Sequence, residues 1–349
     1  ARCGPAPVDP DGYCERCGLR QPTGRDHAET EAGGAAGVTD RGLRHARNED
    51  AMAPVALGAA AGVAAGTAGG GARAPLSCVV GVVCDGVSSS PRADEASAAA
   101  AGACAAVLPF ELAAGADPET ATRTAAARAA AAVAALGSGV HDAPACTYVS
   151  AVAGPGWVTV GWVGDSRAYW LPAPPRPGEP LPPGAPPPRD GRPAALPDRD
   201  PEATAPVPPA GPAVPGHALP LTGAALLTED DTAAPGVLSA WLGADAGEVA
   251  ARVRTFAPRV PGVVVVCSDG LWGYLPRAGA LAPFLAGSTP PEAARALVRH
   301  ALDAGGRDNV TVLVIPAGPP PEEGPVREPG GRTTNTPAPR GRPAEEETA

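Results

Sequence analysis

The sequence predicts an α+β layered domain of about 240 ordered residues, and three observations lead to this prediction. Short β-branched, apolar segments have the composition of buried strands. Alanine-rich segments between them have the composition of helices. The 45 glycines and 46 prolines among 349 residues concentrate in a few stretches, so the remaining segments are apolar enough to bury a core.

The N-terminal half begins with two short strand-like segments within residues 31–57. Residues 58–75 are almost pure glycine and alanine, which is typical of a flexible loop. The segment 77–84 (S-C-V-V-G-V-V-C) predicts a buried strand. Two helices are predicted, over 93–112 and 117–136.

The C-terminal half continues with strands. Residues 147–153 and 157–163 are strand-like and joined by G-P-G, which predicts a hairpin, and a further strand follows at 167–171. The remaining predicted elements are strands at 263–267 and 310–315 and a helix at 290–303.

The predicted organisation has three parts. Residues 1–30 form a short cysteine-bearing segment, residues 31–316 the main domain, and residues 317–349 a disordered tail. Residues 172–219 are dominated by proline, so they bury too little apolar surface to offset the entropy of ordering. We interpret them as a disordered insertion rather than a domain boundary, because strand-like sequence resumes after them.

Charge and cysteine content limit the function. The net charge is −10 and all 27 basic residues are arginines without a basic stripe, which argues against nucleic-acid binding. No run of about 18 apolar residues lacks charge or glycine, so no membrane span is predicted. The scattered thiols in apolar segments favour a reducing, cytoplasmic location. They are Cys78, Cys84, Cys104, Cys146 and Cys267.

The N-terminal cysteines have zinc-ligand spacing. Cys14 and Cys17 form a C-x-x-C pair followed by glycine, and Cys3 resembles the end of a matching first knuckle. We expect a structural Zn²⁺ ribbon that the start of the sequence cuts, with the partner of Cys3 preceding Ala1. Three sulfurs hold zinc poorly, so His27 is a candidate fourth ligand. We expect weak or no zinc binding by the sequence that begins at Ala1. Such a ribbon more often mediates protein contacts than catalysis.

Aspartates lie at three strand ends. Asp85 follows V-V-C, Asp269 follows V-V-C-S, and Asp308 precedes the last predicted strand. Carboxylates at the edge of a core need a counter-charge, which Mg²⁺ or Mn²⁺ supplies. The alternative is that Asp-Gly marks ordinary turns. With the Glu49-Asp50 pair included, composition and spacing leave a two-metal hydrolytic site and the turn interpretation about equally supported.

Seven segments occur in the order typical of one family. They are T-D-R-G-L-R-H-A-R-N-E-D-A (39–51), V-V-C-D-G-V (82–87), A-C-T-Y-V-S-A-V (145–152), V-G-D-S-R-A-Y (163–169), L-T-E-D-D-T (227–232), S-D-G-L (268–271) and R-D-N-V-T-V (307–312). Through them the chain resembles the metal-dependent protein serine/threonine phosphatases, the protein phosphatase 2C family, of the bacterial (actinobacterial) type. The resemblance implies a β-sandwich of two antiparallel sheets flanked by helix pairs, four layers in the order α-β-β-α, with metals at one end.

The resemblance also implies metal ligands. Asp85 would bridge two Mn²⁺ or Mg²⁺ ions, and the carbonyl of Gly86 would bind one of them. Asp269 and Asp308 would bind the other, and Glu49 would act through metal-bound water. The implied reaction is one-step hydrolysis of phosphoserine and phosphothreonine by a water that bridges the metals, with no cysteine or serine nucleophile. The implied partners are phosphorylated proteins of bacterial signalling, including a Ser/Thr kinase and its substrates.

Further residues support this implied site. Asp50 and Asn309 would hold the ligands in place. A third metal, where present, would involve Asp165, or in some bacterial members an acid near Asp142. The alternative for Asp165 is a structural turn aspartate opposite Arg167.

The sequence departs from the family pattern at three places. His45 stands where an arginine usually binds the phosphate, so phosphate binding falls to His45 or to Arg44. Residues 87–90 read V-S-S-S and supply no histidine as general acid. Only residues 233–237 replace the usual helical flap, so the flap subdomain is expected to be largely absent, the cleft more open and substrate discrimination looser. These departures keep open an alternative function, a catalytically weak scaffold or phosphoprotein-binding module.

Overall fold

The computed structural model describes residues 16, 25–58, 77–139, 142–174, 217–234, 236–247 and 249–320. Several sequence predictions lie outside these residues. They are the zinc ligands Cys3, Cys14 and Cys17, nearly all of the glycine/alanine loop, most of the proline-rich insertion and most of the C-terminal tail.

The first sheet has six strands in the order β1-β2-β16-β15-β8-β10, and every neighbouring pair is antiparallel. The strands are β1 (His27–Ala32), β2 (Ala35–Asp40), β8 (Arg167–Pro172), β10 (Ala225–Leu226), β15 (Gly262–Cys267) and β16 (Val310–Ala317). Strand β1 belongs to this sheet and begins at His27. The sheet therefore starts within residues 1–30, which were assigned to the separate cysteine-bearing segment. Nδ1 of His27 lies 2.8 Å from the carboxylate oxygen Oδ2 of Asp40 within that sheet.

The second sheet also has six strands, in the order β3-β4-β6-β7-β14-β9. The strands are β3 (Ala51–Leu57), β4 (Cys78–Cys84), β6 (Tyr148–Gly154), β7 (Trp157–Val163), β9 (Leu219–Leu221) and β14 (Arg252–Pro258). The edge strand β9 runs parallel to β14, so the expectation of a wholly antiparallel sheet is wrong for this strand.

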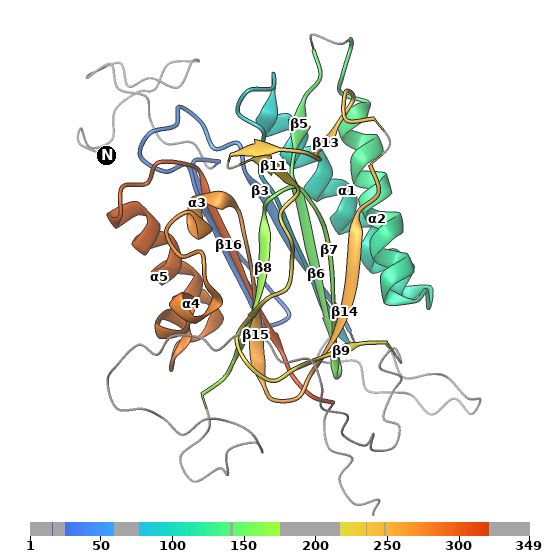
Figure 1. Ribbon diagram of the computed structural model, residues 1–349, viewed down its shortest axis with the longest axis vertical. Coiled ribbons are helices and arrows are strands. Elements are labelled where there is room, and N and C mark those ends of the chain that lie inside the picture. The colour runs from blue at the N-terminus through green and yellow to red at the C-terminus, as the bar shows by residue number, and fades with distance from the viewer. Residues whose placement is uncertain are drawn as a thin grey trace, which may run out of the picture.

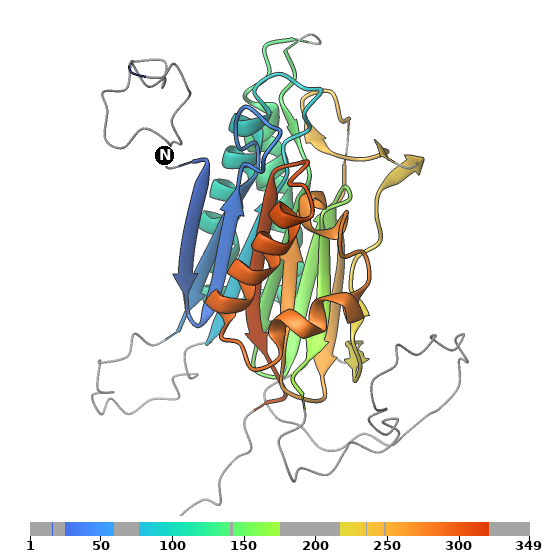
Figure 2. The same ribbon diagram turned by 90° about the vertical axis from the view of Figure 1, so that its left-hand side faces the viewer.

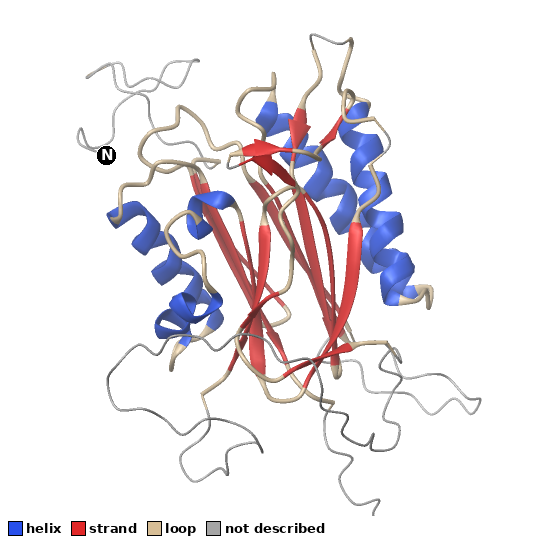
Figure 3. Ribbon diagram, in the orientation of Figure 1, coloured by secondary structure: helices blue, strands red, loops and turns tan. Residues whose placement is uncertain are grey.

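The two sheets face each other over one apolar core (Figures 1 and 3). Both sheets contribute fully buried side chains to it, including Trp162 and Val83 from one and Trp170, Leu313 and Ile315 from the other. Such interdigitation of two inner faces is the usual core of a β-sandwich. The predicted α+β class is confirmed.

Helices cover the outer faces of both sheets. Helices α1 (Ala93–Ala113) and α2 (Pro118–Ala134) pack on the second sheet. Helices α4 (Ala278–Leu285) and α5 (Pro290–Asp303) pack on the first, as Figure 2 shows from the side. The short helix α3 (Asp269–Trp272) begins directly after β15.

Local sequence explains where these helices begin. Asp117 accepts hydrogen bonds from the backbone N–H groups of Glu119 and Thr120, which caps α2 at its predicted start. Thr289 and Glu292 form a reciprocal capping box at the start of α5. Both predicted helix ranges are therefore confirmed to within a few residues.

Helix α1 is long and apolar enough to cross a membrane, with a mean hydropathy of 1.5, and 44% of that segment is buried inside the molecule. It packs along α2 and on β3 and β4. Its first turn carries Asp94 and Glu95. One side of the helix is therefore packed inside the layered domain.

Two short ribbons complete one end of the sandwich. Strand β5 (Ala145–Cys146) pairs with β13 (Leu242–Gly243). Strands β11 (Thr232–Ala234) and β12 (Val237–Leu238) form a small, mostly exposed hairpin. The helical flap was expected to be largely absent, and this hairpin lies at its positions in the chain.

The five described cysteines are buried free thiols, as their apolar surroundings predicted. Burial raises the pKa of Cys78 to about 11 and that of Cys104 to about 12. Because only the thiolate is a good nucleophile, these cysteines serve packing rather than catalysis.

Candidate metal and phosphate site

Four acidic segments meet at one end of the sandwich. Asp85 follows Cys84, the last residue of β4. Cys84 pairs with Ala51, the first residue of β3, and Asp50 directly precedes Ala51. Asp269 comes shortly after Cys267, the last residue of β15. Cys267 pairs with Val312 of β16, and Asp308 lies just before the start of that strand. Strand pairing therefore carries acids that are distant in sequence to the same end, as the sequence analysis expected.

The electrostatics show that three of these carboxyl groups lie close together. Burial and then repulsion by Asp308 raise the pKa of Asp269 to about 7. Burial raises the pKa of Asp50 to about 6, against the opposing hydrogen bonds from Thr311 and Ser268. Burial, followed by repulsion from Asp50 and Asp269, raises the pKa of Asp85 well above its usual range.

Asp50 lies at the centre of a buried hydrogen-bond network. One carboxylate oxygen, Oδ2, accepts from the hydroxyls of Ser268 at 2.8 Å and Thr311 at 2.7 Å. The other, Oδ1, is buried and has no hydrogen-bond partner among the described residues. A buried acceptor without a donor is costly, so this oxygen favours a nearby proton or cation.

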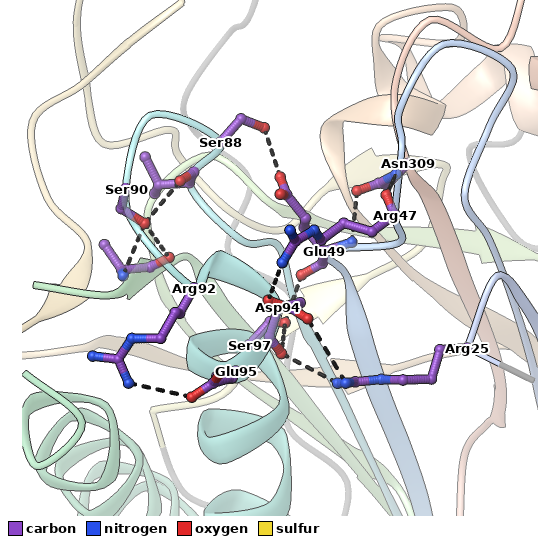
Figure 4. Close-up of polar contacts among 12 residues, drawn as sticks. Arg25, Arg47, Glu49, Ser88, Ser90, Arg92, Asp94, Glu95, Ser97 and Asn309 are labelled. Carbon is purple, nitrogen blue, oxygen red and sulfur yellow. Dashed lines mark hydrogen bonds and ion pairs between the residues drawn. The ribbon is translucent and has the colours of Figure 1, made fainter. Parts of the chain in front are cut away.

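Glu49 is held by contacts on both its backbone and its side chain (Figure 4). Its backbone N–H donates to the side chain of Asn309 at 2.7 Å, and its carbonyl accepts from Ser97 of α1 at 2.5 Å. Its carboxylate accepts from the hydroxyl of Ser88 at 3.0 Å. Glu49 is thus fixed by three different segments.

Asn309 closes the loop of residues 41–49 against the start of β16. Its side-chain amide donates to the carbonyl of Arg41 at 2.7 Å and to that of Arg47 at 3.0 Å. Together with the bond to Glu49, all three contacts of this side chain go to the same loop. The predicted supporting role of Asn309 agrees with this geometry.

Glycines allow these segments to approach closely. A Cβ on Gly86 would stand 2.8 Å from the carbonyl oxygen of Glu49 and 2.7 Å from that of Ala93. A Cβ on Gly270 would overlap the carbonyl of Asn309. The glycine after each of these two aspartates is therefore a requirement of packing at the site.

Asp308 is less buried than its neighbours and has a partner of its own. Its carboxylate lies 3.1 Å from Nε2 of His45, and 41% of its side chain is exposed. His45 is thus placed against a predicted metal ligand rather than in open solvent.

Three arginines line this loop differently. Arg44 is exposed and has no hydrogen bond or ion pair with the described residues. Arg47 and Arg25 both reach Asp94 at the start of α1, at 3.3 Å and 3.7 Å (Figure 4). Arg44 is therefore the arginine of this loop that is free to meet an anion.

The two candidates for a third metal have different surroundings. The pKa of Asp165 is raised by burial and by repulsion from Asp230, and Asp308 also repels it, so it lies beside the acid cluster. Asp142 instead accepts from Arg92 at 2.8 Å, and hydrogen bonds from Ser138 and Arg92 lower its pKa. The structure brings Asp165, and not Asp142, to the cluster.

Arg167 is a residue whose role the sequence analysis left undefined. It binds Asp230 with two hydrogen bonds, of 2.9 Å and 2.7 Å, and its guanidinium stacks 3.8 Å from the ring centre of Trp272. A bidentate, stacked arginine is rigid, so it fixes the segment of Asp230 against the end of α3.

Other contributors escaped the sequence analysis as well. Ser88 and Ser97 hold Glu49, while Ser268 and Thr311 hold Asp50. Single hydroxyl residues carry no spacing signal, because their partners come from distant segments. The V-S-S-S departure at 87–90 was the one available hint for Ser88.

The chemistry of the donors fits divalent cations. Carboxylates and a backbone carbonyl are hard oxygen ligands, which Mg²⁺ and Mn²⁺ favour. The described acidic, histidine and cysteine side chains nevertheless include no group of three already arranged around a metal.

The fold resembles solved phosphatase structures. No protein-family description and no curated protein sequence matches the chain. An arginine-to-lysine variant of a bacterial serine phosphatase matches with a TM-score of 0.54 and 16% identity, over 82% of this chain and 98% of that chain. The S. agalactiae serine/threonine phosphatase matches with a TM-score of 0.50 and 16% identity, over 81% and 98%.

The catalytic domain of the serine threonine protein phosphatase PstP, in complex with two manganese ions, matches at 21% identity and a TM-score of 0.48, over 81% of this chain and 97% of that one. The protein therefore has a mixed α+β fold shared with serine/threonine protein phosphatases.

Proposed function

We propose that the protein hydrolyses phosphoserine and phosphothreonine in other proteins and depends on two divalent cations, Mn²⁺ or Mg²⁺. The observation that carries this proposal is the gathering of Asp50, Asp85 and Asp269 at one end of the sandwich, where Asp50 is buried with its Oδ1 unpartnered among the described residues and Asp85 and Asp269 are half-buried. Such an arrangement is destabilising unless a positive ion binds there.

The cation ligands in this proposal are the carboxylates of Asp85, Asp269 and Asp308 and the carbonyl of Gly86, with Glu49 beside them. When bound, two cations would lower the pKa of a water molecule between them and offset charge on the phosphoryl oxygens. Asp165 is the candidate for a third cation, since it lies beside the cluster.

The protein's own residues position the reaction. Asn309 and Ser88 orient Glu49, and Asp50 ties β3 to β16 through Thr311. Arg44, exposed and without a partner among the described residues, is the better phosphate ligand, because His45 already contacts Asp308. Of the two candidates left by the sequence, we therefore propose Arg44 as the phosphate ligand.

The second candidate function is a phosphoprotein-binding module of weak activity. The contact between His45 and Asp308 favours it, because it occupies a carboxylate that the first proposal assigns to a metal. Within either proposal, phosphorylated proteins are the partners, and a Ser/Thr kinase and its substrates are the candidates in bacterial signalling.

One experiment separates the two functions. Protein freed of metal with a chelator is mixed with a phosphoserine peptide, and phosphate release is measured while Mn²⁺ or Mg²⁺ is added. Metal-dependent release, reduced at least a hundredfold in Asp269→Ala, supports the phosphatase. Glu111→Gln is the matched control, since it removes a carboxylate charge about 24 Å along α1 from its first turn. Peptide binding without release supports the binding module.

A further inference from the structure

A cavity of about 500 Å³ lies beside the acid cluster and takes no part in the proposed hydrolysis. One wall is the segment of residues 87–91, and the rest of the lining includes β12, Trp241 and Asp245. Ala143 and Ala145 complete the lining. This volume falls in the range of pockets that bind small ligands or side chains.

The first wall is rigid. The backbone N–H of Val87 donates to the carbonyl of Ala145 at 2.9 Å, and the hydroxyl of Ser90 accepts from the backbone N–H of Ala145 at 3.1 Å. Ser90 also bonds back to the carbonyl of Val87 at 2.8 Å. The segment is therefore fixed to β5, and the cavity has a preformed side.

The cavity and the acid cluster share backbone. Val87 follows Gly86 directly, and Gly86 forms a β-bridge with Cys146, the neighbour of Ala145. The carbonyl of Asp85 accepts from the N–H of Thr147 at 2.7 Å. The cavity wall thus begins directly after the predicted ligands Asp85 and Gly86, so a peptide with its phosphoserine at the cluster can place a neighbouring side chain in the cavity.

The lining contributed by residues 237–245 is apolar with one negative charge. Val237 is 53% exposed, and Leu238 lies half-buried beside it. The indole N–H of Trp241 donates to Oδ1 of Asp245 at 3.0 Å, which holds the half-buried ring in place. The second oxygen of Asp245 has no partner among the described residues, and Asp245 is the one charged residue in the described lining.

We propose that this cavity binds an arginine or lysine side chain that flanks the phosphorylated residue of the substrate. The apolar lining suits the long stem of such a side chain, and the face of Trp241 and the carboxylate of Asp245 suit its positive head. An acidic side chain would meet Asp245 without a cation to offset it. The net charge of −10 adds a general attraction for basic peptides. The proposal rests on the proposed phosphatase function and names its substrate class.

The test compares phosphoserine peptides that carry arginine, leucine or glutamate at one of three positions on either side of the phosphoserine. At one of these positions, kcat/KM for the arginine peptide should exceed that for the leucine peptide about threefold to tenfold, and the glutamate peptide should be poorest. The preference should disappear in Asp245→Asn and persist in Glu111→Gln, which makes the same charge change far away. Rates on p-nitrophenyl phosphate, which cannot reach the cavity, normalise each variant.

A charge reversal guards against simple loss of folding. Asp245→Lys should turn the preference toward the glutamate peptide at the same position, a gain that a damaged fold does not produce. Hydrolysis of all peptides at equal rates, or a preference for leucine that Asp245→Asn leaves intact, would overturn this inference and leave the phosphatase standing. No hydrolysis of any substrate with Mn²⁺ or Mg²⁺ would overturn both.

Discussion

The two sides of the site differ in how firmly they are built. On one side, residues 41–50 are tied by the three bonds of Asn309, by the contact of His45 with Asp308 and by Ser97 of α1. On the other side, β11 and β12 form a short hairpin with mostly exposed residues. The groups proposed for chemistry lie on the fixed side, and the more open side contributes to the cavity proposed for recognition. Precise placement matters for chemistry, whereas recognition of varied proteins tolerates an open wall.

Loosening the fixed side should have the largest effect. Asn309→Ala removes all three bonds to the loop and leaves a backbone N–H and two carbonyls without this partner. We expect kcat to fall about a hundredfold, because Glu49 loses its position, and the free energy of unfolding to fall by about 3 kcal/mol. Kinetics and denaturant unfolding measure these effects.

Asn309→Asp is the matched variant, since it keeps the acceptor for Glu49 and loses the two donated bonds. It should lie between the wild type and Asn309→Ala in both measurements. Wild-type kcat in Asn309→Ala would show that the fixed loop is irrelevant to the reaction.

The charges on the fixed side should make the metal-free protein sensitive to pH. The folded-state pKa values of Asp50 and Asp269 are about 6 and about 7, above the ordinary value of 3.8. The folded protein therefore holds these protons more strongly than the unfolded chain does, so stability should decrease as pH rises from about 4 to about 7. The expected loss is on the order of 5 kcal/mol.

Thermal unfolding with a chelator present at pH 5 and pH 7.5 tests this expectation. Added Mn²⁺ should restore stability at pH 7.5, and Asp50→Asn should flatten the dependence. A metal-free protein that becomes more stable at pH 7.5 would show that these carboxyl groups do not repel one another.

Two of the arginines of the fixed loop, Arg44 and Arg47, provide a direct comparison. Arg44 is exposed without a partner among the described residues, whereas Arg47 is paired with Asp94. We expect Arg44→Ala to raise KM for a phosphopeptide about tenfold, as for the loss of a charged contact to phosphate. Arg47→Ala should raise it by less than about twofold. An equal rise in KM for Arg44→Ala and Arg47→Ala would show that Arg44 has no special role in phosphate binding.

The open side should tolerate change with the smallest effect. Thr232→Ala alters an exposed position of β11. The expected change in the free energy of unfolding is below about 0.5 kcal/mol. A loss above 2 kcal/mol in denaturant unfolding would mean that the hairpin is as firmly built as the opposite loop.

Much of the fold was predictable because its strands and helices have strong local signals. The hairpin of β6 and β7 and the capped helix α5 agree with their predicted ranges. Strand β14 was missed because two arginines interrupt its apolar pattern; they lie toward Glu229 on the surface. The parallel edge strand β9 follows the proline-rich insertion and carries a proline itself, so nothing local indicates its partner.

The site was predictable in part, for a different reason. Acids at strand ends give a visible spacing, so the gathering of Asp85, Asp269 and Asp50 could be expected, and their roles as ligands stay a prediction. The hydroxyls around Asp50 and Glu49 and the pair of Arg167 with Asp230 depend on contacts between distant segments. Such contacts leave no pattern in a single sequence.

The bridge between Gly86 and Cys146 has a consequence for how this protein can diverge. The same few backbone residues border both the acid cluster and one wall of the cavity. A substitution that reshapes this wall therefore also disturbs the acid cluster. New substrate preferences can therefore arise with least harm through Val237, Leu238 and Asp245, which belong to the rest of the lining. Evolutionary change in substrate selectivity is therefore expected mainly at these three residues.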